Sequence, residues 1–409
     1  MKQLFEAFLV QDEDTKFIAM QTLVEIARQE YESVHFYFDQ LLHITSSAAL
    51  SQDEKLGSQG IEFWTSLAEE EVSRRKRQLP IQDYIRRCSS QLVKLLIACI
   101  QRVNIEDEED EDDELGVALS SGCCLNAVAL VIGNDIMGPI IEFVSQNITN
   151  QNWKQRYSAL IALGAITEGP DKMQFMSIIM PGFQNLLQLF QDQNGKVREA
   201  IAWVMSKICE HHAEMLTSNP AVLQHVIPIF MTSVKDKPRI SNQICRAIEY
   251  LATSTATPVN NPLSAFFQPL FQLLIENAYR TDFDGGQADL TLASFAAISA
   301  LCEGAAEEIN DVLYQVLIPV LQLLEKTLSV DMQNFGEKRA KDLQDYLGGV
   351  LQIILVKVGH KLDDALASSI VKLLIMIFQA IKRVTENGLI ALSGLINGVG
   401  DRLDLNEFG

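Results

Sequence analysis

Apolar residues recur every three or four positions along almost the whole chain, with polar residues between them. A clear example is the segment that contains Phe17, Met20, Leu23, Val24 and Ala27. On an α-helix, this spacing places the apolar side chains along one face, which can pack against a neighbouring helix. The alternation of apolar and polar residues that is typical of half-buried strands is essentially absent. The pattern therefore predicts an all-α protein.

Residues that end or interrupt helices occur at regular intervals. They divide the chain into about eighteen predicted helices of roughly 12 to 22 residues. The positions are Pro80, Gly133, Gly169 with Pro170, Asn219 with Pro220, Pro258 to Pro262, Gly285 with Gly286, and Gly359.

The predicted helices repeat in pairs. Three segments share one pattern: KQRYSALIALGAITEG from Lys154, KVREAIAWVMSKICEH from Lys196, and PRISNQICRAIEYLAT from Pro238. Arg156 and Arg198 occupy the same place in successive units and are 42 residues apart. HEAT-type solenoids have two helices per unit and a period of about 40 to 47 residues. We therefore expect an α-solenoid, a superhelix of about nine antiparallel HEAT-type helix pairs, as one continuous array over residues 1–409.

An aspartate precedes the second helix of these units. Asp192 lies shortly before Val197 and Arg198, and Asp236 lies just before Pro238. We expect each aspartate to cap the helix that follows it, and the arginine to pair with an acidic neighbour. The chain begins with MKQLFEAFLV and ends with DRLDLNEFG, neither of which resembles a polar capping repeat. Since solenoids normally need capping repeats, we expect the middle of a longer superhelix.

The composition limits the kind of partner. The net charge of −20 and the pI of about 4.7 disfavour nucleic acid and anionic membranes and favour partners with basic segments. We expect no apolar run of membrane-spanning length and no secretion signal. The seven cysteines contain no CxxC pair, and the adjacent Cys123 and Cys124 have no further ligand at metal-binding spacing. They are typical of reduced core thiols in an intracellular protein.

Nine consecutive carboxylates follow one predicted helix and hold nearly half of the net charge. Such a run repels itself and cannot pack against apolar surface, so we expect a solvated loop over residues 104–114. An acidic run is often only a solubilising linker, but its place between two amphipathic helices favours a docking surface for a basic partner. Its members are Glu106, Asp107, Glu108, Glu109, Asp110, Glu111, Asp112, Asp113 and Glu114.

Two further groups are candidates for a binding groove. In QGIEFWTSLAEEE, Glu62 and Glu69 are seven residues apart and share a helical face with Glu70, while Phe63 and Trp64 are predicted to point into the core. On the concave side of a solenoid these carboxylates attract basic peptides, although an ordinary solvated face fits the spacing equally well.

The second group is Glu199 and Trp203, one turn apart on one predicted helix. An acid beside an indole suits an extended basic segment, because the ring stacks on the stem of a Lys or Arg side chain. A core tryptophan is the alternative.

Several other features have simpler explanations. RRKR at residues 74–77 resembles a nuclear localisation signal, but we interpret residues 73–80 as a basic linker between repeats that also offers a partner for the acidic loop. His211 and His212 are expected to end a helix, where a cation is favourable. No nucleophile motif or phosphate-binding glycine loop is found, so we expect no enzymatic activity and no cofactor or metal.

Several motifs in order resemble the central HEAT repeats of the importin-β (karyopherin-β1) family. They are QGIEFWTSLAEEE, the acidic run, GCCL, the NW pair ending at Trp153, GAITEGPDK and KVREAIAWVMSKICE. The resemblance covers nearly the whole chain and is strongest between Gln59 and Cys209. It implies a monomeric nuclear import receptor, present in the cytoplasm, the nucleus and the nuclear pore, that releases cargo when it binds the GTP form of Ran.

The resemblance also implies roles for residues of this chain. Residues 106–114 are expected to contact Ran and the basic arm of importin-α or a basic nuclear localisation signal. The same groove is expected to include Glu62, Glu69, Glu70, Glu199 and Trp203. Tyr37, Leu41 and Leu42 are expected to form a pocket for phenylalanine-glycine (FG) nucleoporins.

The chain departs from the family pattern at several groove positions. Leu115 and Gly116 stand where Trp-Asn usually follows the acidic run, and Tyr157 stands where related proteins carry an acid. Arg246 replaces a groove tryptophan, with Asn242 in place of its acid-type partner. Arg246 is expected to repel a basic peptide, which leaves binding of importin-α open.

Two alternatives remain from the sequence. One is another member of the karyopherin-β family. The other is a HEAT-repeat scaffold that assembles an enzyme complex, but such a scaffold has no reason to carry nine acids within one repeat.

Overall fold

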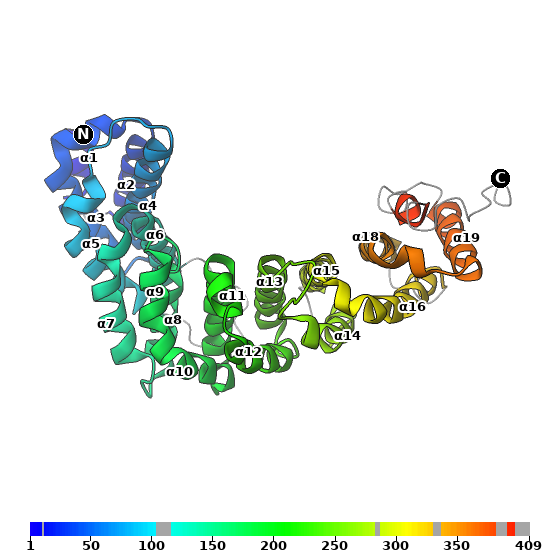
Figure 1. Cartoon of the computed structure of the whole chain (residues 1–409). Coiled ribbons are helices and arrows are strands. Elements are labelled where there is room, and N and C mark those ends of the chain that lie inside the picture. Colours follow the sequence, from blue (N-terminus) through cyan, green and yellow to red (C-terminus); the bar gives the residue numbers. More distant parts are fainter. Residues whose placement is uncertain (10–11, 104–115, 283–286, 330–336, 382–390, 397–409) are drawn as a thin grey trace. The chain divides into compact units, whose positions relative to one another are not determined.

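The computed structural model describes residues 1–9, 12–103, 116–282, 287–329, 337–381 and 391–396. These residues form helices joined by turns and contain no β-strand (Figure 1). They belong to two compact units, Met1–His212 and Ala213–Gly409, and each unit is a stack of helix pairs. The predicted all-α class of HEAT-type helix pairs is confirmed, whereas one continuous array over residues 1–409 stays a prediction. The acidic run at residues 106–114, together with Leu115, lies outside the described residues.

In the first unit, α2, α4, α6 and α8 pack against one another in succession, and α3, α5 and α7 form a second layer on them. The helices of this unit are α1 (Lys2–Ala7), α2 (Glu13–Gln29), α3 (Phe38–Ala49), α4 (Glu54–Lys76), α5 (Tyr84–Ile100), α6 (Val117–Ile132), α7 (Met137–Asn147), α8 (Trp153–Ala165), α9 (Lys172–Ile179), α10 (Phe183–Gln188) and most of α11 (Gly195–Thr217). Short 3-10 helices join some of them: η1 (Tyr31–Tyr37), η2 (Gly133–Ile136), η3 (Met180–Gly182) and η4 (Leu189–Gln191).

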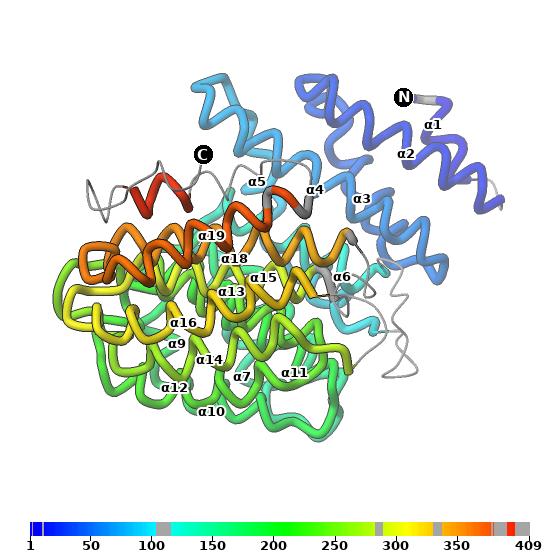
Figure 2. The backbone as a smooth tube through the Cα atoms, turned by 90° about the vertical axis from the view of Figure 1, so that its right-hand side faces the viewer, coloured from blue at the N-terminus to red at the C-terminus, as the bar shows by residue number. Residues whose placement is uncertain are grey.

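In the second unit, α13, α15 and α18 lie side by side, as Figure 2 shows, and α14 and α16 pack on α15 and α18. The helices of this unit are α12 (Pro220–Ser233), α13 (Pro238–Ser254), α14 (Phe267–Ala278), α15 (Gln287–Gly304), α16 (Asn310–Lys326), α18 (Glu337–Val358) and α19 (Asp364–Ile381). Its 3-10 helices are η5 (Ser264–Phe266), η6 (Glu307–Ile309) and η7 (Gly359–Lys361).

Helix α2 shows how the sequence pattern produces this packing. The Asp12 carboxylate caps the helix by accepting a hydrogen bond from the Thr15 amide at 3.1 Å. Met20, Leu23 and Ala27 are fully buried on the face predicted from the apolar spacing. The stripe packs against α4, so most of the stability of α2 comes from contacts with its neighbour rather than from the isolated helix.

Helix C-termini in the first unit are completed by side chains from a neighbouring repeat. Arg102 donates to the Ala49 carbonyl at the end of α3 at 2.8 Å, and Asn126 donates to the Ala165 carbonyl at the end of α8 at 3.0 Å. The last carbonyls of a helix have no partner within it, so a donor from elsewhere must satisfy them. These partners are 53 and 39 residues apart, close to one repeat, which ties each helix end to the adjacent repeat.

The second unit has a similar link between repeats, because Lys357 near the end of α18 donates to the Ala305 carbonyl just after α15 at 2.6 Å. The Asn261 amide, which precedes α14 of the same helix pair, donates to the Gly304 carbonyl at 2.7 Å. Burial lowers the pKa of Lys357.

The predicted capping role of Asp192 and Asp236 is wrong. Asn194, not Asp192, accepts from the Lys196 amide at the start of α11, at 2.9 Å. Asp192 instead accepts two hydrogen bonds, at 2.7 and 2.8 Å, from Arg156 on α8. Asp236 accepts from the adjacent Lys237 amide, and α13 has no side-chain cap at its first turn. The aspartate therefore joins successive repeats, because a bidentate pair with arginine is stronger than a single capping bond.

A buried carboxyl group organises the connection from α4 to α5. Glu71 is fully buried, and its Oε1 accepts from the Tyr84 amide at 2.6 Å and from the Tyr31 hydroxyl at 3.3 Å. The residue before α5, Asp83, has a left-handed backbone (φ 52°) and makes no side-chain cap. Glu71 therefore caps α5 from another helix, and its burial raises the pKa of its carboxyl group.

The prediction of a linker over residues 73–80 is wrong for residues 73–76, which form the last turn of α4. Arg74 pairs with Glu70 and Glu32 at 2.8 Å each, and Arg75 donates to the Val131 carbonyl at 2.8 Å. Basic side chains are favourable at a helix C-terminus, which explains why this charged segment continues the helix.

The predicted cationic role of His211 and His212 is also wrong. His212 lies within α11 at a break in the helical backbone (φ −133°, ψ 19°), is 2% exposed and stacks on Phe175. Its Nε2 lies 2.8 Å from the Thr167 carbonyl. Burial lowers the pKa of both histidines, so the neutral imidazole is the form that this environment favours.

Among the described residues, the segment Val117–Asn147 is long and apolar enough to cross a membrane, contrary to the expectation from the sequence. It comprises α6, η2 and α7, and 56% of its apolar 18-residue stretch is buried. Gly133, with φ 64°, interrupts it between α6 and α7. The core helix of a soluble protein passes the same test of length and composition.

We predict that Arg156→Met lowers the free energy of unfolding by about 2 kcal/mol, measured by urea denaturation. The substitution leaves Asp192, whose side chain is 7% exposed, without its bidentate partner. Arg246→Met is the matched control, because Arg246 is exposed on α13. Equal effects of the two substitutions would contradict a structural role for the Arg156–Asp192 pair.

We predict that acid destabilises the protein partly through His212. Because its pKa in the folded protein lies below the ordinary value of 6.5, the unfolded chain takes up this proton at higher pH than the folded chain. The stability that depends on the neutral ring is therefore complete above that value and is lost as the pH falls toward the lower folded pKa.

The measurement is the melting temperature at about pH 7.5 and about pH 5.5, where histidine titrates. The drop between these pH values is expected to be smaller in His212→Gln than in the wild type. His225→Gln, an exposed site on α12, is expected to leave the drop unchanged. A wild-type drop in His212→Gln would rule out this contribution.

Candidate functional site

Helix α4 carries the first group of predicted groove residues. It begins at the Asp53 cap, which accepts from the Leu56 amide at 2.9 Å, and runs for 23 residues. Phe63 and Trp64 are buried, as predicted, and the Trp64 indole donates to the Thr45 hydroxyl at 2.9 Å. These contacts fix the rotation of α4 and therefore the directions of its charged side chains.

The three predicted carboxylates of α4 lie in different environments. Glu62 forms an ion pair with Arg28 of α2 and keeps a side-chain exposure of 36%. Glu69 is exposed and has no ion pair or hydrogen bond with any described residue. Glu70 is paired with Arg74, which also pairs with Glu32. Glu62 and Glu69 thus share a face at seven-residue spacing, whereas Glu70 is turned away and neutralised.

Helix α6 packs against α4 and completes this surface. Cys123 is the exposed residue among the seven free cysteines. Desolvation raises the pKa of its thiol, and the negative charges of Glu62 and Glu69 raise it further. The electrostatic field of both carboxylates therefore reaches Cys123 on α6. We call the surface formed by Glu62, Glu69, Cys123, Ala127 and Leu130 the α4–α6 face.

The described residues on both sides of the acidic run are firmly held. Before the run, the Val103 carbonyl accepts from Lys154 on α8 at 3.0 Å. After it, the Val117 amide donates to Glu54 on α4 at 2.9 Å. Val103 and Val117 are both buried, the first beside the N-terminal end of α8 and the second beside that of α4.

Trp203 on α11 belongs partly to the core and partly to the surface. Its ring lies directly against Gly164 of α8, where any Cβ would clash with the indole. The side chain is nevertheless only half-buried, as is that of Glu199 one turn earlier. Tyr157, two turns before Gly164 on α8, contacts Trp153 edge to face at 6.4 Å. The two interpretations of Trp203 from the sequence are therefore compatible.

The predicted pocket for FG nucleoporins is only partly accessible. Leu41 is 2% exposed and belongs to the core, so it can contribute only to the floor of the predicted pocket, which stays a prediction. Its place on the apolar stripe of α3 explains this, since the same face packs on α4. Leu42 is half-buried, whereas Tyr37 is 36% exposed and meets Phe5 edge to face at 5.8 Å.

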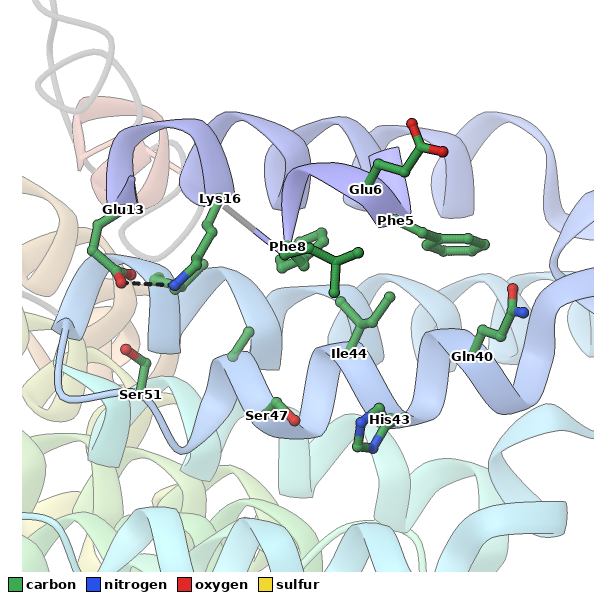
Figure 3. A pocket seen from close by; sticks show the side chains of 13 residues that line it. Phe5, Glu6, Phe8, Glu13, Lys16, Gln40, His43, Ile44, Ser47 and Ser51 are labelled. Atoms are coloured by element: carbon green, nitrogen blue, oxygen red, sulfur yellow. Dashed lines mark hydrogen bonds and ion pairs between the residues drawn. The ribbon is translucent and has the colours of Figure 1, made fainter. Parts of the chain in front are cut away.

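A cavity of about 660 Å³ lies nearby, between α1, the start of α2, and α3 (Figure 3). Phe8, just after α1, and Ile44 of α3 point toward each other across it. Phe36, next to Tyr37 in the chain, is 78% exposed and adds to the apolar surface of this part of the first unit.

In the second unit, α13 presents an exposed cation where the family pattern has a groove tryptophan. Arg246 is exposed, and Asn242 donates to the Asp289 carbonyl at 3.4 Å. Burial raises the pKa of Glu249, and the charge of Arg246 partly opposes this shift. Among the described residues, no group of three or more His, Cys, Asp or Glu side chains could hold a metal ion.

Comparison with known proteins finds importin subunit beta-1 among the relatives of this chain. The family model "Importin subunit beta-1-like, TPR repeats" matches residues 225–405, and a HEAT-repeat model matches residues 183–212. Importin subunit beta-1 of Arabidopsis thaliana is 28% identical, with 88% of this chain and 43% of that protein covered. Importin subunit beta-1 of Saccharomyces cerevisiae is 29% identical, with 87% and 41% covered. The chain thus spans less than half the length of these relatives.

Solved structures of importin-beta have the same fold as this chain. Yeast importin-beta (Kap95p) has a TM-score of 0.86 at 26% identity, with 99% of this chain and 47% of that chain covered. The Kap95:Nup1 complex gives 0.87 at 26%, with 100% and 48% covered. A structure of Kap95p binding to RanGDP gives 0.88 at 25%, with 99% and 48% covered. The chain is thus similar in sequence and in fold to importin subunit beta-1 over most of its length.

Proposed function

We propose that this chain is part of a nuclear import receptor that moves between cytoplasm and nucleus through the nuclear pore. Its α4–α6 face and acidic run bind basic segments, either the arm of importin-α or the localisation signal of a cargo. The acidic run at residues 106–114 also contacts Ran in its GTP form. The outer helices bind FG nucleoporins.

The observation that carries this proposal is the exposed carboxylate of Glu69 on α4, which has no ion pair or hydrogen bond among the described residues. Glu62 lies on the same face and stays partly exposed, although it is paired with Arg28. The chain has a net charge of −20, so its field attracts basic segments toward this face. The cap of α4 and the burial of Phe63 and Trp64 hold both carboxylates in position before any partner arrives.

The half-buried Trp203 extends the proposed groove along the first unit. Its ring rests on the glycine backbone of α8, so it needs no reorganisation to accept the stem of a Lys or Arg side chain. Glu199, one turn earlier, supplies a carboxylate for the charged end.

Arg246 limits the proposal for the second unit. The exposed Arg246 on α13 repels a basic peptide. One turn earlier, the neutral Asn242 stands in place of an acidic side chain that could bind such a peptide. Binding of a basic segment is therefore assigned to the first unit and the acidic run, and the family's further groove positions on α13 are not used.

Two solved structures support the assignment of the other partners. One is the complex of Kap95 with Nup1, and the other concerns the binding of Kap95p to RanGDP. For this chain, the exposed rings of Phe36 and Tyr37 are the proposed nucleoporin contact. Phe5, which contacts Tyr37, also lines the cavity between α1 and α3. Its apolar lining offers space for a phenylalanine ring.

The test is a titration of the chain with a fluorescent peptide of the importin-α basic arm at two salt concentrations. We predict binding that weakens as salt increases. Neutralising residues 106–114 to Asn and Gln is expected to weaken it about tenfold or more, as the attraction of several charges is lost. Glu69→Gln and Trp203→Ala are each expected to weaken it by about two- to fivefold.

Glu142→Gln, an exposed position on α7, is the matched control and is expected to leave the affinity unchanged. Failure of the wild-type chain to bind the peptide would contradict the proposal for basic partners. Equal losses for Glu69→Gln and Glu142→Gln would contradict the assignment to the α4–α6 face.

A further inference from the structure

A second feature of the α4–α6 face is a cleft of about 390 Å³ with both signs of charge at its rim. It lies between the C-terminal half of α4 and the end of α6. Its lining residues are Glu69, Val72, Ser73, Lys76, Arg77, Ala127 and Leu130. The floor is thus apolar, with one carboxylate near the middle of α4 and two cations where that helix ends.

The charged groups of this cleft are available to a ligand. Glu69, Lys76 and Arg77 are exposed, and none makes an ion pair or hydrogen bond with the described residues. The adjacent cations differ, because Arg74 is held by Glu70 and Glu32, and Arg75 by the Val131 carbonyl. In the basic cluster at the end of α4, Arg74 and Arg75 are therefore held by contacts within the protein. Lys76 and Arg77 make no such contact with the described residues and can pair with a ligand.

The charges follow a regular spacing along one face of α4. Glu62, Glu69 and Lys76 are seven residues apart in turn, so they lie almost in line, about 10 Å from each other along the helix axis. A peptide in the extended polyproline II conformation has three residues per turn and advances about 3.1 Å per residue. Its side chains at intervals of three therefore lie on one face and cover about the same distance. A peptide lying along α4 therefore meets negative, negative and positive charge at intervals of three residues.

We propose that this cleft binds an extended peptide segment in which two basic residues and one acidic residue follow one another at intervals of three. One basic residue pairs with Glu69, and the other pairs with Glu62 in place of its present partner Arg28. The acidic residue pairs with Lys76 and Arg77, and an apolar residue between them rests on Val72, Ala127 and Leu130. The inference rests on the proposed function and narrows its ligand class from any basic segment to one that ends in an acidic residue.

The cleft also selects against an alternative ligand. A uniformly basic peptide of the same length places a third cation beside Lys76 and Arg77, and this like-charge contact opposes binding in that register. Charge complementarity at the end of α4 therefore sets where a basic segment stops on this face.

The test compares two fluorescein-labelled peptides with blocked ends on the full chain. One is Lys-Ala-Ala-Lys-Ala-Leu-Glu, and the other has Lys in place of the final Glu. The measured quantity is the ratio of their dissociation constants, by fluorescence anisotropy at low salt. The ratio cancels the general attraction of the acidic protein for basic peptides.

Lys76→Glu and Arg77→Glu are each expected to shift this ratio toward the all-basic peptide by about fivefold or more, because each reversal turns one attraction into a repulsion. Lys94→Glu on α5 makes the same change in net charge at an exposed site outside the cleft and is expected to shift the ratio less than twofold. Circular dichroism of each variant checks that α4 remains folded.

The outcomes separate this inference from the proposed function. If both peptides bind and Lys76→Glu and Arg77→Glu shift the ratio no more than Lys94→Glu, the cleft proposal is overturned while recognition of basic segments stands. If neither peptide nor the importin-α arm peptide binds the wild-type chain, the proposed function fails, and this inference fails with it.

Discussion

The structure depends on one constraint: the last carbonyls of its helices must find donors outside the helix. In each unit some of these donors come from the neighbouring repeat, as Arg102 does for Ala49 and Lys357 for Ala305. Each repeat therefore helps to complete the hydrogen bonds of the next, in the manner of a one-dimensional array. The half-buried Arg156–Asp192 pair adds a charged link of similar range. Because these polar contacts face the joints between repeats, they fix how each helix is rotated and which of its residues reach the surface.

The rotation of α4 places the adjacent charged residues Glu69, Glu70 and Glu71 in different environments, where they have different roles. Glu69, Glu70 and Glu71 are consecutive, yet successive residues of a helix point about 100° apart. Glu69 is exposed, Glu70 is neutralised by Arg74, and Glu71 is buried where it caps α5. The proposed binding face is thus built from the one carboxylate of the three that the fold does not use. The same holds for the basic cluster at the end of α4, where Arg74 and Arg75 serve the structure and Lys76 and Arg77 remain available.

The apolar period of the sequence was sufficient to predict the helical class, the repeat and the buried stripe of α2, because burial of one face is what the period encodes. It could not separate the roles of polar residues. Asp192 has the spacing of a cap but pairs with an arginine of the previous repeat, and the basic segment at residues 73–76 continues α4. The burial of Leu41 and of His212 was not predicted for the same reason, since it depends on a neighbouring helix and not on local sequence. Glu71 was missed because nothing in a run of three glutamates marks the buried member.

The central claim is that a basic segment binds on the face formed by α4 and α6 and the acidic run between α5 and α6. The most direct measurement is photo-cross-linking with an importin-α arm peptide that carries a photoreactive group, followed by mass spectrometry of the linked residues. The account predicts cross-links within Glu54–Lys76, Val117–Ile132 and residues 106–114 that disappear with excess unlabelled peptide. Competable cross-links confined to α3, α5 and α7, on the other layer of the first unit, would contradict it.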